Sequence, residues 1–437
     1  MDRYTKSQDY LARALKVTPG GAQTLSKRAV RFPIGAYPVA LIEGFGAYVF
    51  DVDGHKYLDM ICALACMTLG YARRDVVLPA AAQLGRGIAF SLAHPLEAEV
   101  AEKLCALIPC AEQVRFVKTG SEATEAAIRV ARKATGRHMI VTVEGGYHSW
   151  HSWFQATKPQ HPGIPEGYAN MVDTFRYNNL LALNHLLRTH QTAAVILEPC
   201  HYDAPEPGFL EGVRDLCTEY GAVLIFDEMV TGFRWENGGA QEHFCVTPDL
   251  ATFGKACANG FPLAFLCGKA DLMQHADVVS GTFGGEVVSL SACNAVLDIY
   301  AKEPIVQTLW ARGTQFQEGF NRLAAELGRQ AICDGYPVKP RIRFTTSNAL
   351  DRAQLTPDRN TLAMSLFLQE TARGGVLWHP AGGNVSAAMT TEDIDMALTV
   401  MHAALVVVQK ALHSGNWSVL EGEPIHGTPF VRSGAPL

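Results

Sequence analysis

The sequence predicts an α/β protein with a large domain built on a mostly parallel sheet and a second, smaller α/β domain. The first observation is that helical patterns alternate with short apolar runs between about residues 95 and 300, as expected of successive βαβ units. The second is a change of texture after Tyr300, where longer helical segments surround a stretch with two prolines. A chain of 437 residues has room for about two or three domains.

The N-terminal part predicts a helix and then a hairpin. Residues 6–16 have a helical pattern, which a Pro-Gly-Gly run ends at residues 19–21. Residues 46–59 place β-branched and aromatic residues on both sides of Asp53-Gly54, a dipeptide typical of hairpin turns.

The central part supplies the alternation on which the fold class depends. Helical patterns lie at residues 96–108, 121–135, 180–190 and 209–220. Apolar runs that predict strands lie at residues 139–143, 193–197, 223–226 and 263–267. Because helices separate these runs, most of the strands should be parallel.

The C-terminal part predicts three more helices. They are expected at residues 304–328, 358–374 and 391–413, and the last begins with a capping pattern at Thr391. The expected domain limits are 1–55 for the N-terminal segment and part of the small domain, 56–305 for the large domain and 306–437 for the C-terminal small domain.

The composition limits the classes of partner and the compartment that can be expected. The chain has 37 basic and 43 acidic residues, a formal charge of −6, and no run of Lys and Arg, so neither nucleic acid nor a membrane is expected as a partner. Eleven cysteines without a CxxC pair predict reduced thiols in a cytoplasmic protein and no zinc site. The polar N-terminus predicts no secretory signal.

Lys255 and Asp227 are the residues from which a chemistry can be inferred. Lys255 lies in an apolar, glycine-flanked run, where a lysine can lose its proton and attack an aldehyde. Asp227 follows four apolar residues, as expected of a carboxylate at the C-terminal end of a buried parallel strand, where open α/β sheets bind ligands. Singly, a surface lysine and a helix-capping acid are plainer interpretations. Together they favour pyridoxal phosphate, which needs a Schiff-base lysine and a carboxylate at its ring nitrogen.

A glycine-serine turn precedes the helical pattern at 121–135. The backbone amides of Gly120, Ser121 and Glu122, with the Ser121 hydroxyl, would form an anion site at a helix N-terminus. Taken alone, Ser121 would more simply be an N-cap. Beside the lysine and the aspartate, binding of the cofactor phosphate is the favoured interpretation.

An aromatic run follows the first expected central strand. Tyr147 or His148 would lie at the C-terminal end of that strand and could stack on a flat ring. Trp150 and Trp153 are weaker candidates, for which core packing is the alternative. His148 and His151 have no third ligand at suitable spacing, so no metal is expected.

Two further residues are candidates from their places at strand ends. Glu198 follows the expected strand 193–197 and could equally face the site or cap a helix. Strand alternation puts Asp227 and Met229 on one face and Glu228 on the other. Met229 would therefore pack on the cofactor ring whose nitrogen Asp227 meets.

The chain resembles the class III aminotransferases, and within them the branch of glutamate-1-semialdehyde aminomutase. The motifs are TPGGAQTLSK, GAYVFDVDGHKYLD, TGSEATEAAIRVARKATG, EGGYHSWH, AAVILEP, LIFDEMVTGFR, VTPDLATFGKACANGFPLAFLCG and GTFGG, in this order over nearly the whole chain. The resemblance implies the type I fold of pyridoxal-phosphate enzymes. It also implies that Lys255 is the Schiff-base lysine, that Asp227 meets the ring nitrogen, and that Met229 and Tyr147 lie on opposite ring faces.

The resemblance implies a shared site as well. Gly120 and Ser121 would hold the cofactor phosphate, and Thr282 would reach the phosphate of the neighbouring subunit, so a homodimer with shared active sites is expected. The activity implied is transfer of an amino group between an amine donor and a carbonyl acceptor.

Departures from the aminomutase pattern leave alternatives open. Residues 22–27 replace the usual NSPVR, and residues 146–154 replace a smaller GCYHG-like run. An intramolecular aminomutase, a racemase or epimerase, and a catalytically silent protein of the same fold are the other hypotheses. Four arginines could pair with a substrate carboxylate: Arg28, Arg31, Arg234 and Arg343.

Overall fold

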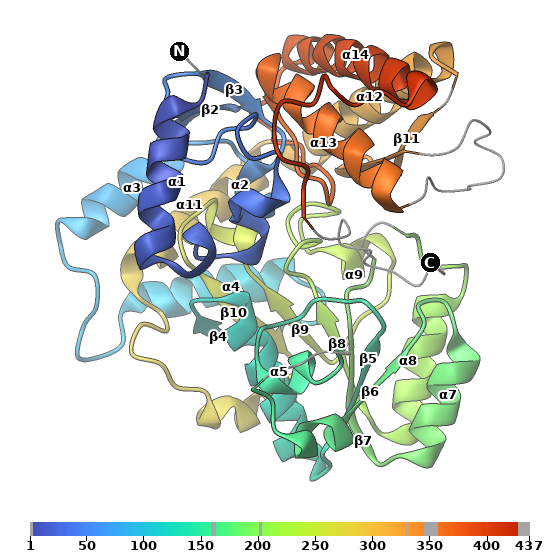
Figure 1. Ribbon diagram of the computed structural model, residues 1–437. Coiled ribbons are helices and arrows are strands. Elements are labelled where there is room, and N and C mark those ends of the chain that lie inside the picture. Colours follow the sequence, from blue (N-terminus) through green and yellow to red (C-terminus); the bar gives the residue numbers. More distant parts are fainter. Residues whose placement is uncertain (1–2, 159–162, 201–202, 329, 345–356, 427–437) are drawn as a thin grey trace. The chain divides into compact units, whose positions relative to one another are not determined.

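The structure, a computed structural model, describes residues 3–158, 163–200, 203–328, 330–344 and 357–426 (Figure 1). These residues form two compact units, one of residues 3–73 and 307–426 and the other of residues 74–306. The expected small domain built from both ends of the chain is thus confirmed. The boundary expected at residues 55–56 lies inside a hairpin, and the division falls after Arg73.

The unit of residues 74–306 is built on a seven-stranded sheet in the order β4-β10-β9-β8-β7-β5-β6. The strands are β4 (Gln113–Val117), β5 (Met139–Val143), β6 (Val172–Phe175), β7 (Thr192–Leu197), β8 (Val223–Asp227), β9 (Leu250–Phe253) and β10 (Ala264–Gly268). β10 runs antiparallel to β4 and to β9, and the other neighbours are parallel. The predicted mostly parallel sheet is confirmed.

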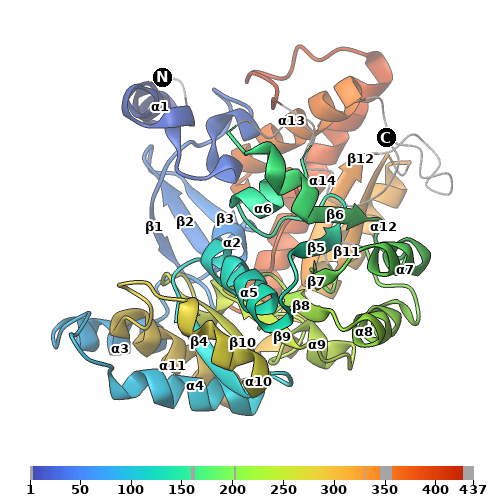
Figure 2. The same cartoon turned by 90° about the horizontal axis from the view of Figure 1, so that it is seen from below.

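Helices cover this sheet. They are α3 (Arg74–Leu84), α4 (Pro95–Leu107), α5 (Gly120–Thr135), α6 (Ser152–Gln155), α7 (Leu180–Thr189), α8 (Phe209–Tyr220), α9 (Ala240–His243), α10 (Ala270–Met273) and α11 (Val287–Lys302). α5 packs along one face, against β7 to β10 (Figure 2). Its small buried residues Ala126, Ala127 and Ala131 allow close approach to a core that includes Ile196 and Ile225. This packing fixes the start of α5 beside the sheet.

The predicted central helices and strands are all found, with their ends shifted by at most one residue. The sequence did not predict β4, β6 and β9, nor helices α3 and α11. β4 was missed because its side chains alternate between exposed and partly exposed positions instead of forming an apolar run. β9 has only four residues, and no strand was predicted in the short run that leads to Lys255.

The unit of residues 3–73 and 307–426 contains two smaller sheets. One has the order β1-β2-β3-β13, and the other pairs β11 with β12. Their strands are β1 (Leu41–Phe45), β2 (Tyr48–Asp51), β3 (Lys56–Asp59), β11 (Ala331–Tyr336), β12 (Lys339–Phe344) and β13 (Val376–Leu377). The main helices are α1 (Thr5–Val17), α2 (Cys62–Ala65), α12 (Ile305–Glu326), α13 (Pro357–Arg373) and α14 (Thr391–Ser414).

α2 is a short left-handed turn. All four residues of Cys62–Ala65 have positive φ, from 48° to 75°, although none is glycine. Each such residue costs roughly 1–2 kcal/mol. Asp59 helps to hold the turn, because its carboxylate accepts hydrogen bonds from the Ile61 amide (2.8 Å) and the Tyr71 hydroxyl (2.5 Å). The Nδ2 of Asn384 donates to the Ile61 carbonyl (3.0 Å).

The N-cap of α14 is Thr390, one residue before the start expected from the sequence. The Thr390 hydroxyl accepts from the Asp393 amide (3.1 Å), and the Asp393 carboxylate accepts from the Thr390 amide (2.8 Å). Thr391, expected to begin the capping pattern, is the first helical residue. By length and composition alone α14 could cross a membrane, a test that buried helices of a protein core also pass. It packs against α13.

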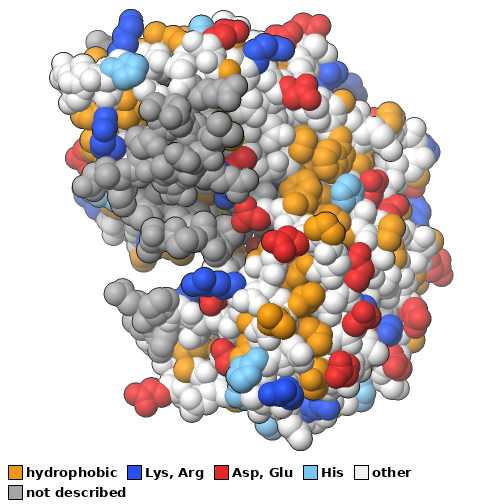
Figure 3. All heavy atoms as spheres, turned by 90° about the vertical axis from the view of Figure 1, so that its right-hand side faces the viewer, with side chains coloured by type: hydrophobic (Ala, Val, Ile, Leu, Met, Phe, Trp, Pro, Cys, Tyr) orange, Lys and Arg blue, Asp and Glu red, His pale blue; other side chains and the backbone are white. Residues whose placement is uncertain are grey.

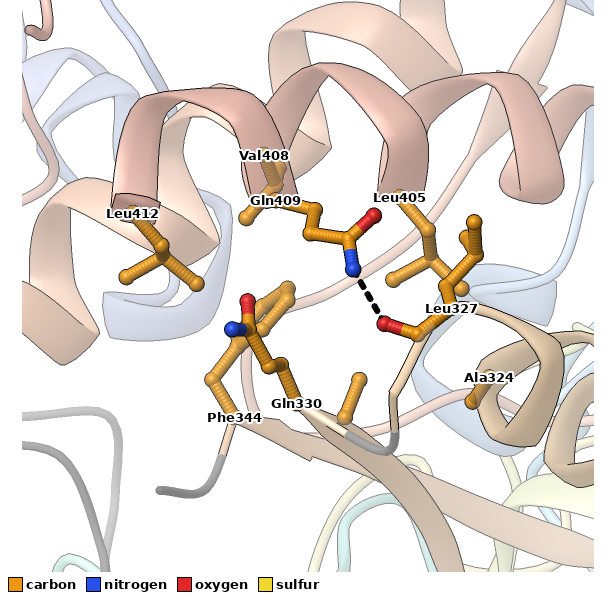
Figure 4. A pocket seen from close by; sticks show the side chains of 9 residues that line it. Ala324, Leu327, Gln330, Phe344, Leu405, Val408, Gln409 and Leu412 are labelled. Carbon is orange, nitrogen blue, oxygen red and sulfur yellow. Dashed lines mark hydrogen bonds between the residues drawn. The ribbon is translucent and has the colours of Figure 1, made fainter. Parts of the chain in front are cut away.

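A very small cavity beside α14 shows that side chains are packed tightly around this helix. Leu405, Val408 and Leu412 of α14 face Ala324 and Phe344 across it (Figure 4). Nearby, the Gln409 side chain donates to a backbone carbonyl at the end of α12. The cavity holds only about 10 Å³, room for about one water at most. It is a packing defect and not a ligand site.

Candidate active site

Five chain segments meet at one edge of the large sheet. β4, β5, β7, β8 and β9 are parallel, so their C-terminal ends lie on the same side. The segments that follow them carry the candidates: Gly120 and Ser121, Tyr147 and His148, Glu198, Asp227, and Lys255. Ligands of open α/β sheets bind at this edge. These residues therefore follow strand ends on the same side of the sheet, as the strand-end argument predicts.

Asp227 is the most firmly held of these side chains. It is only 2% exposed at the end of β8. Its Oδ2 lies 2.7 Å from His148 Nδ1, and its Oδ1 accepts a hydrogen bond from the Met229 amide (3.1 Å). Both contacts fix the direction of the carboxylate. A buried carboxylate without Lys or Arg among these partners is suited to bind a cationic ring nitrogen.

Lys255 lies just after β9, the strand that pairs with β8. Asp227 pairs in register with Thr252 of β9, three residues before the lysine. Lys255 begins a short 3-10 turn (Lys255–Ala258), is half-buried and has a φ of 47°. A non-glycine residue in this left-handed region costs of order 1 kcal/mol or more, and such strain is common at functional sites.

Met229 packs between two glycines at the start of this site. A Cβ on Gly120 would lie 2.9 Å from the Met229 Sδ, and one on Gly254 would lie 2.8 Å from it. Val117 and Ala264 complete its apolar surroundings. Met229 therefore touches both the turn before α5 and the residue before Lys255. Glu228 points the other way and accepts hydrogen bonds from the amides of residues 240 and 241, as the predicted alternation requires.

The start of α5 differs in detail from the prediction. Thr119, not Ser121, is the N-cap, and it forms a capping box with Glu122. The Glu122 amide donates to the Thr119 hydroxyl (3.3 Å), so this predicted phosphate ligand is already used. The amides of Gly120 and Ser121 have no partner among the residues that the structure describes. With the positive end of a 16-residue helix, these two amides are suited to bind an anion.

The segment after β5 is tied to α5. The Thr124 hydroxyl donates to the His148 carbonyl (2.9 Å), and the Trp150 amide lies 3.4 Å from the Ser121 Oγ, which accepts its hydrogen bond. Thr124 was not among the candidates, and only its position one turn after Gly120 could have indicated it. Tyr147 is 40% exposed at the edge of the sheet.

The aromatic run divides between core and surface. Trp153 and Phe154 are buried, so the core-packing alternative holds for Trp153. Trp150 is exposed. His151 pairs with Glu125 (3.3 Å) and is not near a cluster suited to a metal among the described residues.

Glu198 and Thr282 have different positions relative to this edge. Glu198 is half-buried at the end of β7, and it does not cap α8, whose N-cap is Gly208. Thr282 is exposed in the loop before α11. That loop and the side chains of Lys118 and Glu122 line a hollow of about 240 Å³. The structure does not bring Thr282 next to Asp227 of the same chain.

One of the four candidate arginines, Arg343, is bound to an acid of its own unit. Arg343 donates to Asp334 (2.7 Å), as does Arg341 (2.8 Å). Arg234 is fully buried. The Nε of Arg28 is buried without a hydrogen-bond partner among the described residues.

These features suit pyridoxal phosphate. The cradle at Gly120 and Ser121 offers two amides to the phosphate, and Asp227 offers a buried carboxylate to the ring nitrogen. Lys255 offers an amine from the adjacent strand end. Each group that the cofactor requires therefore has a counterpart at the same sheet edge.

Comparisons with known proteins agree with this chemistry. The family model described as aminotransferase class-III matches residues 34–332. The 3-aminobutyryl-CoA aminotransferase of Cloacimonas acidaminovorans (strain Evry) is 34% identical over 424 residues, which cover 94% of this chain and 99% of that protein.

Several solved structures have the same fold. The pyridoxal-phosphate internal aldimine form of FumI from Sphingopyxis sp. MTA144 superposes with a TM-score of 0.86 at 28% identity, covering 94% of this chain and 98% of that one. An omega-transaminase from Sphaerobacter thermophilus gives 0.85 at 26% identity, covering 92% and 98%. A glutamate-1-semialdehyde-aminomutase from Pseudomonas aeruginosa PAO1, at 20% identity and a TM-score of 0.82 over 93% and 95%, shows the fold alone. The chain belongs to the class III aminotransferases, enzymes that use pyridoxal phosphate to transfer an amino group from an amine donor to a carbonyl acceptor.

Proposed function

We propose that Lys255 and Asp227 are the two side chains that operate the cofactor in this enzyme. The observation that carries the proposal is the buried Asp227 carboxylate, fixed at the end of β8 beside the strand that leads to Lys255. When bound, pyridoxal phosphate supplies an electron sink for the bonds at the carbon that bears the amine. Asp227 keeps a negative charge at the ring nitrogen and so favours its protonated form.

Lys255 is assigned two tasks. Its Nζ would hold the cofactor covalently until the substrate amine takes its place. It then takes the proton from the amine-bearing carbon as a general base and returns it as an acid. The amides of Gly120 and Ser121 bind the phosphate, and Met229 supports the ring between Gly120 and Gly254.

Chemical trapping tests the lysine. Borohydride should remove the visible band of the holoenzyme and leave the cofactor attached to the peptide that contains Lys255, as mass spectrometry would detect. Lys255→Ala should bind cofactor only reversibly and have no turnover. Lys269→Ala is the matched control, because Lys269 pairs with Asp249 (2.6 Å) away from this edge. Trapping at another lysine would overturn the assignment.

We infer that the amine donor carries its nitrogen on a carbon beyond the α carbon of an acid or thioester. The support is the 34% identity with an aminotransferase named for 3-aminobutyryl-CoA. This favours intermolecular transamination over the aminomutase alternative. A half-reaction screen should show loss of the visible band with 3-aminobutyrate or its thioesters and a much slower change with alanine or glutamate. A reversed order would place the substrate among α-amino acids.

We propose that the enzyme is a homodimer with shared sites. In the unit of residues 74–306, large apolar side chains are exposed near the loop that holds Thr282, among them Phe283, Ile88 and Phe90. The Ile88 carbonyl accepts from the Val287 amide (3.0 Å), so these segments form one surface. A second copy would cover this surface and bring its Thr282 hydroxyl to the phosphate cradle, which two amides alone do not fill.

Mixed dimers test the shared site. Thr282→Val and Lys255→Ala subunits, each inactive or weakened alone, are exchanged with one another. In the proposed dimer one site of each mixed pair carries both lesions and the other carries neither, so activity should reappear. No recovery in mixed dimers that have been shown to form would mean that Thr282 serves its own subunit.

A cytoplasmic location is proposed as well. All eleven cysteines are free thiols, eight of them buried, as expected in a reducing compartment. On the face that carries α7 and α8, acidic and basic side chains are mixed with hydrophobic ones (Figure 3), a distribution that does not favour nucleic acid or an anionic membrane as a partner. Fractionation of cells that express a tagged chain would check the location.

A further inference from the structure

We propose that Lys118 is a positioning residue for the cofactor site of the neighbouring subunit, on which it acts through Thr282 of its own chain. Its ion pair with Glu286 holds the loop of residues 279–285 (the Thr282 loop) in the conformation that presents Thr282 to that site. The inference rests on the homodimer with shared sites proposed above. It gives the ammonium group of Lys118 a task in the other subunit's site and none at the phosphate of its own.

The ion pair between Lys118 and Glu286 is shielded from water. Lys118 Nζ lies 2.7 Å from Glu286 Oε1, and only 18% and 9% of the two side chains are exposed. The pair of Lys103 and Asp298, which also reaches α11, is 40% and 48% exposed. Water and salt screen a partly buried pair much less than a surface pair. The Lys118 contact is therefore the stronger of these two ties to α11.

Glu286 is itself fixed to the start of α11. Its carboxylate accepts hydrogen bonds from the amides of Val288 (2.9 Å) and Ser289 (3.1 Å), so it is the N-cap of that helix. Burial alone would raise the pKa of Glu286, but hydrogen bonds from Lys118 and Ser289 lower it below its usual value. Lys118 is thus paired with an ionised carboxylate that does not move independently of the helix.

Two further contacts hold the Thr282 loop against β4, the strand that Lys118 follows. The Arg115 Nε donates a hydrogen bond to the Val279 carbonyl (3.0 Å), at the start of the loop. A Cβ on Gly284 would lie 3.0 Å from the Phe116 carbonyl oxygen, so the loop passes directly against the strand. The loop is therefore held on both sides of Thr282, which is exposed.

A direct contact between Lys118 and the phosphate of its own site is the alternative, because no other cation is as close in sequence to Gly120 and Ser121. The hydrogen bonds of Lys118 favour the loop. Its Nζ donates to the Ser289 hydroxyl (3.3 Å) as well as to Glu286. An ammonium group that a carboxylate already neutralises adds little attraction for a phosphate.

A double-mutant cycle in cofactor affinity separates the two roles. Thr282→Val should weaken cofactor binding about tenfold, the loss of one hydrogen bond to a charged acceptor. Lys118→Met removes the charge and should weaken binding by about three- to tenfold, because the loop is no longer held. In the Thr282→Val background the same change should cost no more than about twofold, since the contact through which Lys118 acts is already lost. Equilibrium dialysis with pyridoxal phosphate measures each affinity independently of turnover.

Mixed dimers test the direction in which Lys118 acts. Lys118→Met subunits are paired with Lys255→Ala subunits, and borohydride then traps cofactor only on the subunit that keeps Lys255. In the proposed arrangement that site receives the intact Thr282 loop of the other subunit. The cofactor concentration at which half of these sites are trapped, measured by mass spectrometry, should therefore return to within about twofold of the parent's.

Two variants and a control complete the design. Lys118→Arg keeps the charge and should hold cofactor affinity within about threefold of the parent. Glu286→Gln keeps an oxygen to cap α11 but removes the charge, and it should repeat the pattern of Lys118→Met, which covers a failure of Lys118→Met to fold. Lys103→Met breaks the exposed pair with Asp298 and should leave affinity unchanged. Light scattering checks that each variant is a dimer at the concentrations used.

The outcomes separate this inference from the shared site on which it rests. If Thr282→Val leaves affinity unchanged, or its mixed dimers with Lys255→Ala subunits show no recovery, the shared site fails and this inference with it. If Thr282 behaves as proposed, three results would each overturn the role of Lys118 while the shared site stands. They are an unchanged affinity in Lys118→Met, an equal Lys118→Met effect in both backgrounds, and no return of affinity in the mixed dimers.

Discussion

Met229 links the turn before α5 to the turn that carries Lys255, and glycine is needed on each side of it. The Met229 Sδ fills the space that a Cβ would take at Gly120 and at Gly254. Neither glycine is in a left-handed conformation there, so the requirement comes from packing and not from backbone freedom. The size of residue 229 thus determines which side chains its neighbours can carry.

The first prediction is that Gly254→Ala destabilises the cofactor-free protein by about 1–3 kcal/mol, the usual cost of overpacking. Met229→Val shortens the side chain and should recover most of this loss in the double variant. Urea unfolding followed by fluorescence measures both. Gly167→Ala is the control, since a Cβ there meets nothing within 4 Å. Equal stability of Gly254→Ala and the parent would contradict the packing argument.

How far single residues could be predicted depends on their place at strand ends. Lys255, Asp227 and Met229 were identified because each follows an apolar run whose direction and alternation the sequence reveals. The capping residue was misplaced, because Thr119 and Ser121 are both good caps and only the backbone shows which one is helical. The contact from Thr124 to the His148 carbonyl joins segments 24 residues apart and has no sequence signal.

At the scale of elements, the left-handed turn α2 stores strain in the unit of residues 3–73 and 307–426. Four successive non-glycine residues with positive φ persist only because Asp59, Tyr71 and Asn384 fix the surrounding backbone. Removing a Cβ from this turn should relieve strain rather than create a cavity.

The second prediction is that Ala63→Gly raises the free energy of unfolding by up to about 1 kcal/mol, the left-handed penalty less the added entropy of glycine in the unfolded chain. Ala127→Gly, the same change in the middle of α5, should instead lower it by about 1 kcal/mol. Chemical denaturation compares the two. A loss of stability in Ala63→Gly would mean that the methyl group is required by its neighbours.

The third prediction concerns Asp249, which joins β8 to β9. Its carboxylate accepts from the Leu224 amide (2.8 Å), Arg214 (2.8 Å) and Lys269 (2.6 Å). Burial alone would raise the pKa of Asp249, but these partners lower it below the ordinary value. Asp249→Asn should therefore cost about 1–3 kcal/mol at neutral pH.

The pH dependence of the stabilisation by Asp249 follows from the direction of its pKa shift. Because the pKa of Asp249 is lower in the native state than in the unfolded state, its ionised form stabilises the fold. This stabilisation is complete above the unfolded-state pKa of about 3.9, and it is lost as the pH falls from there through the native-state pKa. The stability difference between the parent and Asp249→Asn should shrink in acid. Asp173→Asn, at an exposed carboxylate, is the control. A difference that stays constant down to pH 3 would contradict the linkage.

Elements were predictable where their periodicity was strong. β7 and β8 are both fully buried, so both appear as largely continuous apolar runs. β4 carries Arg115 and half-exposed positions, and β10 gives no sign of its antiparallel direction, because an apolar run has the same composition either way. These features depend on pairing between distant segments.

At the scale of the molecule, the proposed cofactor site would be a source of stability for the unit that contains it. The amides at the start of α5, the Asp227 carboxylate and the Lys255 amine follow three different strands, which come together only in the folded sheet. Ligand that binds only the native state stabilises it by mass action. The fold class and its two units could be inferred from sequence. The amine substrate could not, because its contacts come from side chains that no single motif brings together.

The fourth prediction is that pyridoxal phosphate at about 100 times its dissociation constant raises the free energy of unfolding by about 2.7 kcal/mol. Asp227→Asn should need a higher cofactor concentration for the same gain. A thermal-shift titration measures both, at fixed protein concentration. Pyridoxal without phosphate is the control and should stabilise much less at equal concentration. A cofactor-independent midpoint would contradict a preformed site.

The free thiols also allow the opening of each unit to be timed. Cys245 is exposed, whereas Cys217 is buried in the unit of residues 74–306 and Cys333 in the other. Burial raises the pKa of Cys217 to about 12 and that of Cys333 well above its usual range, so an alkylating reagent meets almost no thiolate at either until the chain opens. The rates at which Cys217 and Cys333 are alkylated, measured in one time course with Cys245 as the rapid reference, therefore report which of the two units opens first.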